Sequence, residues 1–501
     1  MVRVLMLCLV MVLSCRSVAQ ASEPPVIRLT LADAIKTAVE NNLEVRAERY
    51  TPAQQEAEYQ KSRGIYDPTL QLLASYADVT NASSFYLSPP DRQADRSTQL
   101  NAGISQLFFT GGTVSLGFNN SYSRTDATTT VGLDSYWYSS LGLTVSQPLL
   151  KNFGREATEL AIDTARLGKY ASIEQFNTRL SAMVAQVRNE YYTLYSLREE
   201  LEVKKVSLEL ARKILTETQA RVKAGVMPAM EILNAEYGVA SREKELIDAE
   251  RAVSDQTDLL RQLLQLDRTA LVVIAETPSK ARYEVSEQDL IRLALELRPE
   301  IRELKRNLEL LELQTRVSHN RTLPDVTLSA SAATTGLAGT YPKDVDRLGS
   351  GEYPNWNVGL ALAFPLGNRA ADNDYRKNRL KVEQAALRLR NQQELVSNEV
   401  RAAVRAVEAN YKQLEVADRG RAFAEERFKA FARKAEVGLA TNKDVLDVEH
   451  DLATAKNNQI KAQTAYANAV TQLWKVTGEL LDRQQIRMVE RDAEQLYRQV
   501  N

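Results

Sequence analysis

The residues best suited to chemistry in this chain of 501 residues are carboxylates beside a glycine-containing break in a helical segment. Asp444 and Asp447 are one turn apart and share one face of the helix that follows the break. Where several such carboxylates face a narrow passage, they bind cations and repel anions. Acids in a first helical turn also complement the helix dipole, so both interpretations stay open. A second copy of the break places Glu231 opposite Asp444, and Asn234 opposite Asp447.

Other residue patterns give no support for an enzyme. His319 and His450 are the only histidines, and neither has the spacing of a metal-ligand set. No phosphate loop, dinucleotide fingerprint or nucleophile elbow accompanies the helices. We therefore expect no catalytic site, no metal and no cofactor. Lys plus Arg (64) nearly cancels Asp plus Glu (65), which makes nucleic acid an unexpected partner.

The first 21 residues predict a secretory signal peptide. Arg3 precedes an apolar run over 4–13, small residues follow, and we expect cleavage after Ala21. The alternative is a lipoprotein box that ends at Cys15, which would then be acylated. Cys8 and Cys15 are the only cysteines, so the remaining chain forms no disulfide. No later segment has 18 consecutive apolar residues, and insertion into a membrane must therefore use strands.

The rest of the chain reads as two copies of one plan: helix, strands, very long helix, turn, helix. Segment 29–45 parallels 283–301, and the turn KAGVMPAMEILNAE (223–236) parallels EVGLATNKDVLDVE (436–449). We predict four strands in the first copy and two in the second. The predicted divisions are a signal peptide 1–21, a first repeat 22–267, a mid-rod linker 268–285, a second repeat 286–480 and a C-terminal extension 481–501.

A repeat of seven marks the long helices. In the first copy, apolar residues recur every seven positions from Leu180 to Val222. In the second copy they run from Val400 to Ala435, with Arg421 breaking the pattern. A period of seven sustained this long indicates a coiled coil rather than a helix on a globular core. The lengths predict that each copy forms a rod roughly 100 Å long.

Six segments alternate between an apolar face and a face of small polar residues. We expect strands near 69–79, 97–108, 113–124, 136–148, 325–334 and 353–365, with the outward loops 80–96, 125–134 and 335–352 and a tight turn at 109–113. Aromatic residues near the strand ends favour a transmembrane barrel over a soluble sandwich, which alternates in the same way. Six strands cannot enclose a wet lumen, so the chain must form oligomers.

Taken together, these motifs resemble the TolC-like outer-membrane efflux and secretion channel family. The likeness rests on LTLADAIKTAVENN (29–42), SQPLLKNFG (146–154) and the two turns, and it covers about residues 27–480. It implies a mixed α and β fold, in which three protomers share a β-barrel in the outer-membrane lipid. A coiled-coil tunnel continues the barrel into the periplasm. It also implies a duct that works with a periplasmic adaptor and an inner-membrane transporter. Better-known members have four strands per protomer, so the hairpin 97–124 is extra, and two places stay open for it: in the barrel wall, which gives eighteen strands in a trimer, or outside it.

The resemblance also implies roles for residues at the two turns. The implied periplasmic gate consists of Asp444, Asp447 and Glu231. The implied adaptor contacts are Gly225, Val226, Val437, Gly438 and Leu439. Some members lock the closed tip with a tyrosine and an arginine, but Ala435 and Ala440 stand at those places here. The sequence leaves open which residues lock this channel and what it carries.

A non-conducting scaffold that spans the periplasm is the alternative function. Its rods would act as a spacer and its strands as an anchor. The Gly, Ser, Asn and Ala side chains of the polar strand faces favour the duct, because an anchor has no need of a wet lumen.

Overall fold

The computed structural model describes residues 26–82, 92–126, 132–267, 269, 271–284, 286–437 and 439–500. The predicted signal peptide, its cleavage site and Cys15 lie outside these residues. The chain forms two compact units. Unit 1 contains the residues up to Glu48, Asn177–Arg298 and Val396–Arg487, and unit 2 contains Arg49–Phe176, Pro299–Leu395 and the residues from Met488. Each unit draws on both predicted repeats, and the repeat boundaries stay a prediction.

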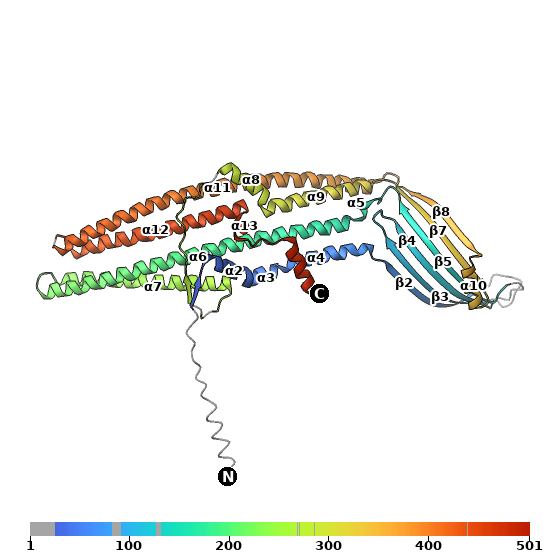
Figure 1. Cartoon of the computed structure of the whole chain (residues 1–501), viewed down its shortest axis with the longest axis horizontal. Helices are drawn as coiled ribbons and strands as arrows, with labels where there is room; N and C mark the ends of the chain where they lie inside the picture. Colours follow the sequence, from blue (N-terminus) through green and yellow to red (C-terminus); the bar gives the residue numbers. More distant parts are fainter. Residues whose placement is uncertain are drawn as a thin grey trace, which may run out of the picture. The chain divides into compact units, whose positions relative to one another are not determined.

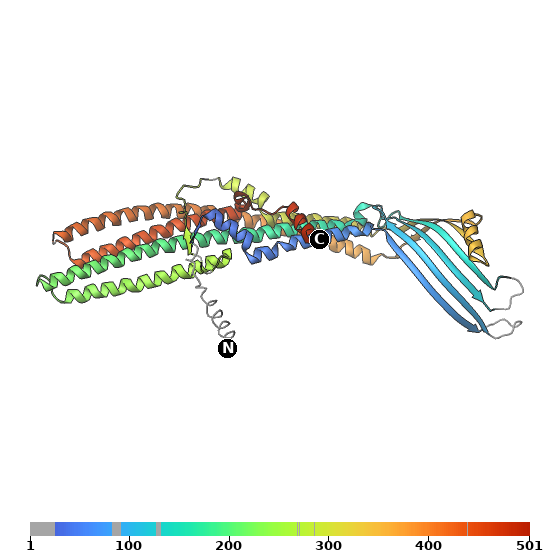
Figure 2. The same ribbon diagram turned by 60° about the horizontal axis from the view of Figure 1, so that its bottom comes forward.

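Unit 1 is built around two helical hairpins. Helix α6 (Leu160–Lys223) pairs with α7 (Met230–Leu264), and α11 (Arg369–Glu436) pairs with α12 (Asn442–Thr477) (Figures 1 and 2). Ion pairs such as Lys204–Glu245, at 2.7 Å, join the two helices of a hairpin. Heptad residues including Leu180, Leu194 and Leu414 are buried, which agrees with the coiled-coil prediction.

A small parallel pairing of strands adds to the core of unit 1. β1 (Val26–Leu29) pairs with β6 (Leu271–Ile274), which lies within the predicted linker. The buried Tyr191 of α6 donates its hydroxyl to the carbonyl of Leu29 at 2.9 Å. The short helices α8 (Glu287–Leu297) and α13 (Leu480–Gln484) also belong to this unit. The sequence pattern did not predict this pairing, which joins segments about 245 residues apart.

The single helix that we predicted at the start of the first repeat is wrong in one respect, because the structure has three helices there. These are α2 (Leu31–Asn41), α3 (Leu43–Glu48) and α4 (Tyr50–Arg63). Asn42 causes the first break, because its side-chain carbonyl accepts hydrogen bonds from the amides of Glu44 and Val45. An asparagine that caps the next helix in this way competes with continuation of the first.

Unit 2 contains a six-stranded antiparallel sheet in the order β2-β3-β4-β5-β7-β8 (Figure 1). The predicted extra hairpin lies inside this sheet, because β3 and β4 separate β2 from β5. Phe108 and Gly112 close the predicted tight turn between β3 and β4, and Gly111 there has φ of 84°. All six strands lie close to their predicted positions: β2 (Thr69–Ala82), β3 (Arg92–Leu107), β4 (Thr113–Thr125), β5 (Ser135–Pro148), β7 (Asp325–Ala338) and β8 (Pro354–Ala363).

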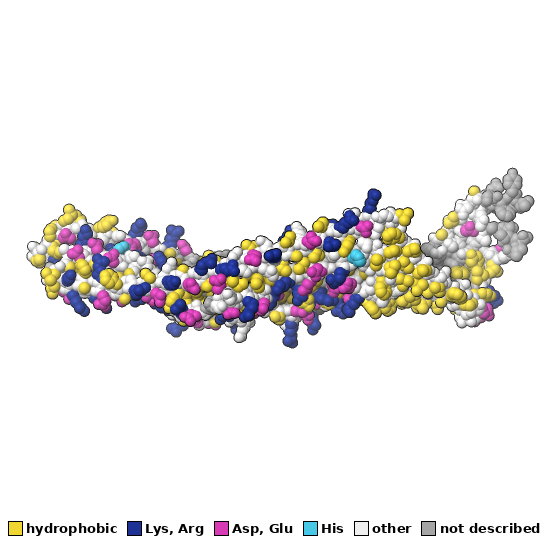
Figure 3. All heavy atoms as spheres, turned by 90° about the horizontal axis from the view of Figure 1, so that it is seen from above, with side chains coloured by type: hydrophobic (Ala, Val, Ile, Leu, Met, Phe, Trp, Pro, Cys, Tyr) yellow, Lys and Arg dark blue, Asp and Glu magenta, His cyan; other side chains and the backbone are white. Residues whose placement is uncertain are grey.

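The strand register sorts the side chains of the sheet onto two contrasting faces. Leu116 lies between Ile104 and Leu143 on one face, and Trp356 and Leu360 of β8 continue that face. The other face carries small and polar residues such as Asn119 and Ser140. Large apolar side chains on β2 and β8 are exposed. In Figure 3, hydrophobic side chains gather over part of the sheet, whereas the helices carry mixed charges.

The segment 335–352, which we predicted as a loop, contains helix α10 (Tyr341–Ser350). The helix packs on the apolar face of the sheet, where Gly336 admits it: a Cβ at Gly336 would lie 2.2 Å from the carbonyl oxygen of Asp344. The side chain of Asp344 is buried and accepts a hydrogen bond of 2.5 Å from Ser139. Asn120 in turn donates to Ser139 at 2.6 Å. The contacts that hold α10 come from the sheet and not from neighbouring residues in the chain, which explains why the local sequence did not predict the helix.

The helical part of unit 2 includes α5 (Arg155–Thr158), the 3₁₀ turn η1 (Gly64–Tyr66), α9 (Pro299–Asn320) and α14 (Glu490–Val500). A buried ion cluster attaches α14 to α4 and α6. Lys169 contacts Glu56 at 3.0 Å and also pairs with Glu490. Among the described residues, no helix combines the length and apolar character needed to cross a membrane.

Candidate functional site

The first turn, between α6 and α7, ends the long helix with a left-handed glycine. Gly225 has φ of 70°, and its amide donates to the carbonyl of Val222 at 2.9 Å. The amide of Val226 donates to Arg221 at 3.0 Å, and the pair of hydrogen bonds forms a Schellman motif. Val226 is 75% exposed. The turn therefore holds an apolar side chain out into solvent.

The second turn, between α11 and α12, has the same closing hydrogen bond. The amide of Leu439 donates to the carbonyl of Lys434 at 2.8 Å. Gly438, one of the implied adaptor contacts, lies outside the described residues. Val437 and Leu439 are 69% and 78% exposed. Both turns thus expose apolar side chains, which suits contact with another protein.

Asp444 acts as a helix cap. Its carboxylate accepts hydrogen bonds from the Thr441 hydroxyl at 2.6 Å and the Thr441 amide at 2.8 Å. Its own amide donates to the Thr441 hydroxyl, which completes a capping box. The hydrogen bond from the Thr441 hydroxyl, followed by that from the Thr441 amide, lowers the pKa of Asp444 below the usual aspartate value. The dipole interpretation therefore has direct geometric support for Asp444.

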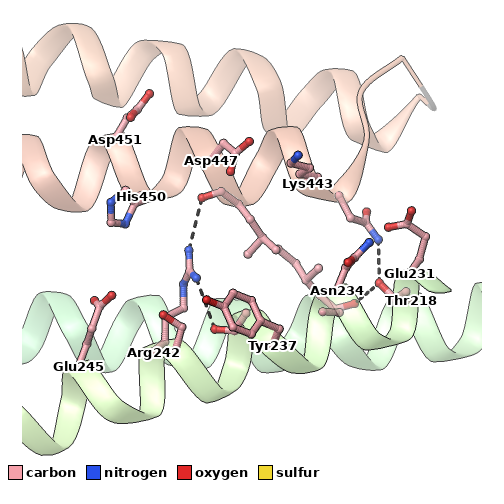
Figure 4. A pocket seen from close by; sticks show the side chains of 16 residues that line it. Thr218, Glu231, Asn234, Tyr237, Arg242, Glu245, Lys443, Asp447, His450 and Asp451 are labelled. Carbon is pink, nitrogen blue, oxygen red and sulfur yellow. Dashed lines mark hydrogen bonds between the residues drawn. The ribbon is translucent and has the colours of Figure 1, made fainter.

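Asp447 and Glu231 line one cavity, which Asp444 does not line. The cavity has a volume of about 550 Å³ and lies among α6, α7 and α12 (Figure 4). Asp447 and Lys443 come from α12, and Glu231 and Asn234 come from α7. The structure thus brings together two of the three predicted gate carboxylates. Each of them reaches this cavity from a different hairpin.

A buried ion pair that the sequence analysis missed joins the two hairpins beside this cavity. Arg242 of α7 contacts Glu449 of α12 at 3.1 Å, and the side chains are only 12% and 9% exposed. Arg242 also donates to the carbonyl of Leu446 at 3.4 Å. A second link runs from Asn442 to Thr218, at 2.8 Å. Glu449 occupies the same place in the second turn segment as Glu236 does in the first, and this repetition marked the position in the sequence. It did not identify Arg242 as the partner of Glu449.

The remaining charged groups at this site show no sign of metal binding. His450 lines the cavity together with Glu245 and Asp451. Within the described part of the chain, no group of three or more His, Cys, Asp or Glu residues is placed to hold a metal ion. The site places several charged side chains together between the helices of the two hairpins.

Comparison with solved structures identifies the fold. The outer membrane protein VceC of Vibrio cholerae matches with a TM-score of 0.63 and 18% identity, over 89% of this chain and 96% of that one. The outer-membrane channel CmeC of Campylobacter jejuni matches with a TM-score of 0.63 and 15% identity, over 93% and 89%. The predicted fold class, long coiled-coil helices joined to a β-sheet as in TolC-like channels, is confirmed.

Sequence comparison identifies the family. The pyoverdine export outer membrane protein OpmQ of Pseudomonas aeruginosa is 24% identical over 370 residues, which cover 72% of this chain and 73% of that protein. The protein of the same name from Pseudomonas putida is 22% identical over 334 residues, or 65% and 66%. The family model for outer membrane efflux proteins matches residues 113–265 and 290–479. This chain therefore belongs to the outer membrane efflux protein family.

Proposed function

We propose that this chain is one protomer of a passive exit duct. Three copies would close a barrel in the outer membrane, and a periplasmic adaptor would connect the duct to an inner-membrane transporter. Channels of this family are non-enzymatic outer-membrane proteins with a large periplasmic helical part, and in general they are trimers with such partners. The OpmQ relatives are export proteins, and we propose the outward direction here as well. Energy would come from the transporter.

The open edges of the sheet carry this proposal. β2 and β8 each have one neighbour among the described strands, and their outward side chains are apolar and exposed. An exposed apolar edge of this length aggregates unless another strand pairs with it. β8 of one protomer and β2 of the next run in opposite directions, so pairing between copies continues the antiparallel order. With six strands each, three copies give eighteen, enough to surround water.

The polar face would line the lumen of that barrel. A hollow of about 360 Å³ lies over it, with Gln71, Ser105, Asn119, Ser140 and Ser331 among its lining residues. Apolar residues on the opposite face would contact lipid. At the hairpin ends, Val226, Val437 and Leu439 would receive the adaptor, together with Gly225 and Gly438. Three copies of Asp447, Glu231 and Asp444 would surround the periplasmic entrance, where their carboxylates attract cations.

Neutralising the entrance carboxylates tests the duct. We expect the wild-type protein in planar bilayers to pass small, cation-selective currents. The variant Asp444→Asn/Asp447→Asn should conduct several-fold more and lose most of its preference for cations, because repulsion and bound counter-ions no longer restrict the entrance.

The matched control is Asp248→Asn/Asp255→Asn, which removes the same charge from exposed positions of α7 and should behave as wild type. Unchanged conductance and selectivity in the first variant would reject the gate. Inserted protein that passes no current under any condition would favour the scaffold.

A further inference from the structure

We propose that the outer end of the sheet's apolar face binds the phosphate groups of an anionic outer-leaflet lipid. The binding surface would be a cationic patch made of Arg124 on β4 and Lys343 on α10. The proposal rests on the proposed function, since it takes the apolar face of the sheet to be the lipid-facing wall. It adds a specific lipid contact that barrel closure does not require.

The height of the patch on the sheet follows from the register. Phe118 and Leu116 of β4 lie on the apolar face, and Asn120, Tyr122 and Arg124 continue that face toward the loop end of the strand. The face therefore changes from apolar to polar within a few residues. Asn120 and Ser139, which would be unfavourable in lipid, are covered by α10 through Asp344. The hydrocarbon boundary would thus lie at the level of α10.

Three aromatic rings mark the same level. Tyr122 lies 5.0 Å from Trp137, and Trp137 lies 4.9 Å from Tyr341 at the start of α10, measured between ring centroids. Tyrosine and tryptophan gather where a membrane protein passes from lipid to water. Arg124 is two residues beyond Tyr122 toward the loop end of β4, on the same face. Lys343 lies on α10 between Tyr341, whose ring is next to that of Trp137, and Asp344, which is hydrogen-bonded to Ser139. Both cations therefore lie close to the level of the aromatic rings, from which a long side chain can reach a lipid phosphate.

The charges of the patch are available to a ligand. Arg124 and Lys343 are exposed, and neither forms an ion pair with a carboxylate in the part of the chain that the structure describes. The nearby Arg96 differs, because Asp78 binds it at 3.0 Å. Asp346 adds one exposed acid on α10.

Arg347 adds a further exposed cation to α10, and one nitrogen of its guanidinium donates to the carbonyl of Leu337. The guanidinium of Arg124 and the ammonium of Lys343, which form no ion pair in the described part of the chain, lie beside an apolar surface. This combination fits a molecule with phosphate groups and acyl chains.

Native mass spectrometry of the purified full chain in detergent tests the proposal, with bisphosphorylated lipid A as the probe. We expect the variant Arg124→Gln/Lys343→Gln to bind about 25-fold more weakly than wild type, since each cation near a membrane surface contributes roughly fivefold. Arg124→Lys should bind nearly as wild type. Lys205→Gln/Lys213→Gln, with the same charge change on α6, should leave binding unaltered. Dephosphorylated lipid A should bind wild type as weakly as the intact lipid binds the double variant.

Equal binding of intact lipid A to wild type and the double variant would overturn the proposal, as would equal binding of the phosphorylated and dephosphorylated lipids. Displacement of the lipid by millimolar inorganic phosphate would also overturn it, because the site would then hold a free anion rather than a membrane lipid. The same spectra report the number of protomers. A trimer that does not bind lipid A contradicts only this inference, whereas a monomer contradicts the proposed function.

Discussion

Replacing Arg242 by alanine is expected to raise the conductance of the channel at least tenfold. The substitution leaves Glu449 buried between the hairpins without its cation. Removing one partner of a buried ion pair costs about 3–5 kcal/mol. This cost destabilises the closed state, in which Arg242 and Glu449 hold α7 and α12 together. Every 1.4 kcal/mol of destabilisation raises the ratio of open to closed channels tenfold. The channel should therefore spend most of its time with the hairpins apart. Single-channel recording in planar bilayers measures the change.

Two further variants separate loss of the link from general damage. Glu449→Ala should open the channel in the same way, because Arg242 then lacks its carboxylate. The exchange Arg242→Glu/Glu449→Arg should return conductance toward the wild-type value, since opposite charges still meet. Arg251→Ala on the same helix removes an exposed cation that pairs with Asp255 and should have no effect. If both single variants conduct as wild type does, the Arg242–Glu449 pair is not the lock.

Replacing Lys169 by methionine should strongly lower the free energy of unfolding. Lys169 and Glu56 are each 2% exposed and contact one another at 3.0 Å. Methionine fills a similar volume but leaves Glu56 as a buried, uncompensated carboxylate, which costs about 3–5 kcal/mol. Glu490 loses its cation too, so α14 should detach from α4. Urea unfolding followed by circular dichroism measures the first effect, and amide hydrogen exchange across 490–500 measures the second.

The double variant Lys169→Met/Glu56→Gln should recover much of the lost stability, because it leaves no buried charge. In wild type, burial lowers the pKa of Lys169, but the hydrogen bonds to Glu490 and Glu56 outweigh this effect and raise it above the ordinary lysine value. The stabilisation is then complete below the ordinary lysine pKa and is lost as pH rises through the raised one. Loss of stability near neutral pH instead, or no loss in Lys169→Met, would contradict this description of the cluster.

Local patterns were enough to predict the strands and the long helices. The alternation from Trp356 to Phe364 was sufficient to predict β8. The recurrence of apolar residues at every seventh position was sufficient to predict α6. Both signals depend on which face of an element is apolar, and the spacing of apolar residues within one short segment determines that face. The glycine turn at Gly225 was equally readable, because a left-handed cap requires glycine or a residue that tolerates its conformation.

Features that depend on distant partners were not predictable. Helix α10 is short and polar, and it is held by the notch at Gly336 and by Ser139, 205 residues from Asp344. Arg242 meets Glu449 across 207 residues, and Lys169 meets Glu490 across 321. The sequence left two roles open for Asp444. Its capping box supports the structural role, and the place of Asp447 in the cavity leaves that residue as the stronger gate candidate.

Closure of the barrel between copies is the central claim, and cross-linking of the open sheet edges tests it most directly. With Cys8 and Cys15 replaced, one cysteine would be introduced on β8 at Val358 and another at successive positions of β2 from Leu70 to Tyr76. We expect at least one pair to oxidise to a covalent trimer in the outer membrane, with no larger species. Leu116→Cys on β4, whose two neighbours are already in place, should form no such trimer with Val358→Cys. Cross-linking that stops at dimers, extends beyond three copies or fails at every position would contradict the account.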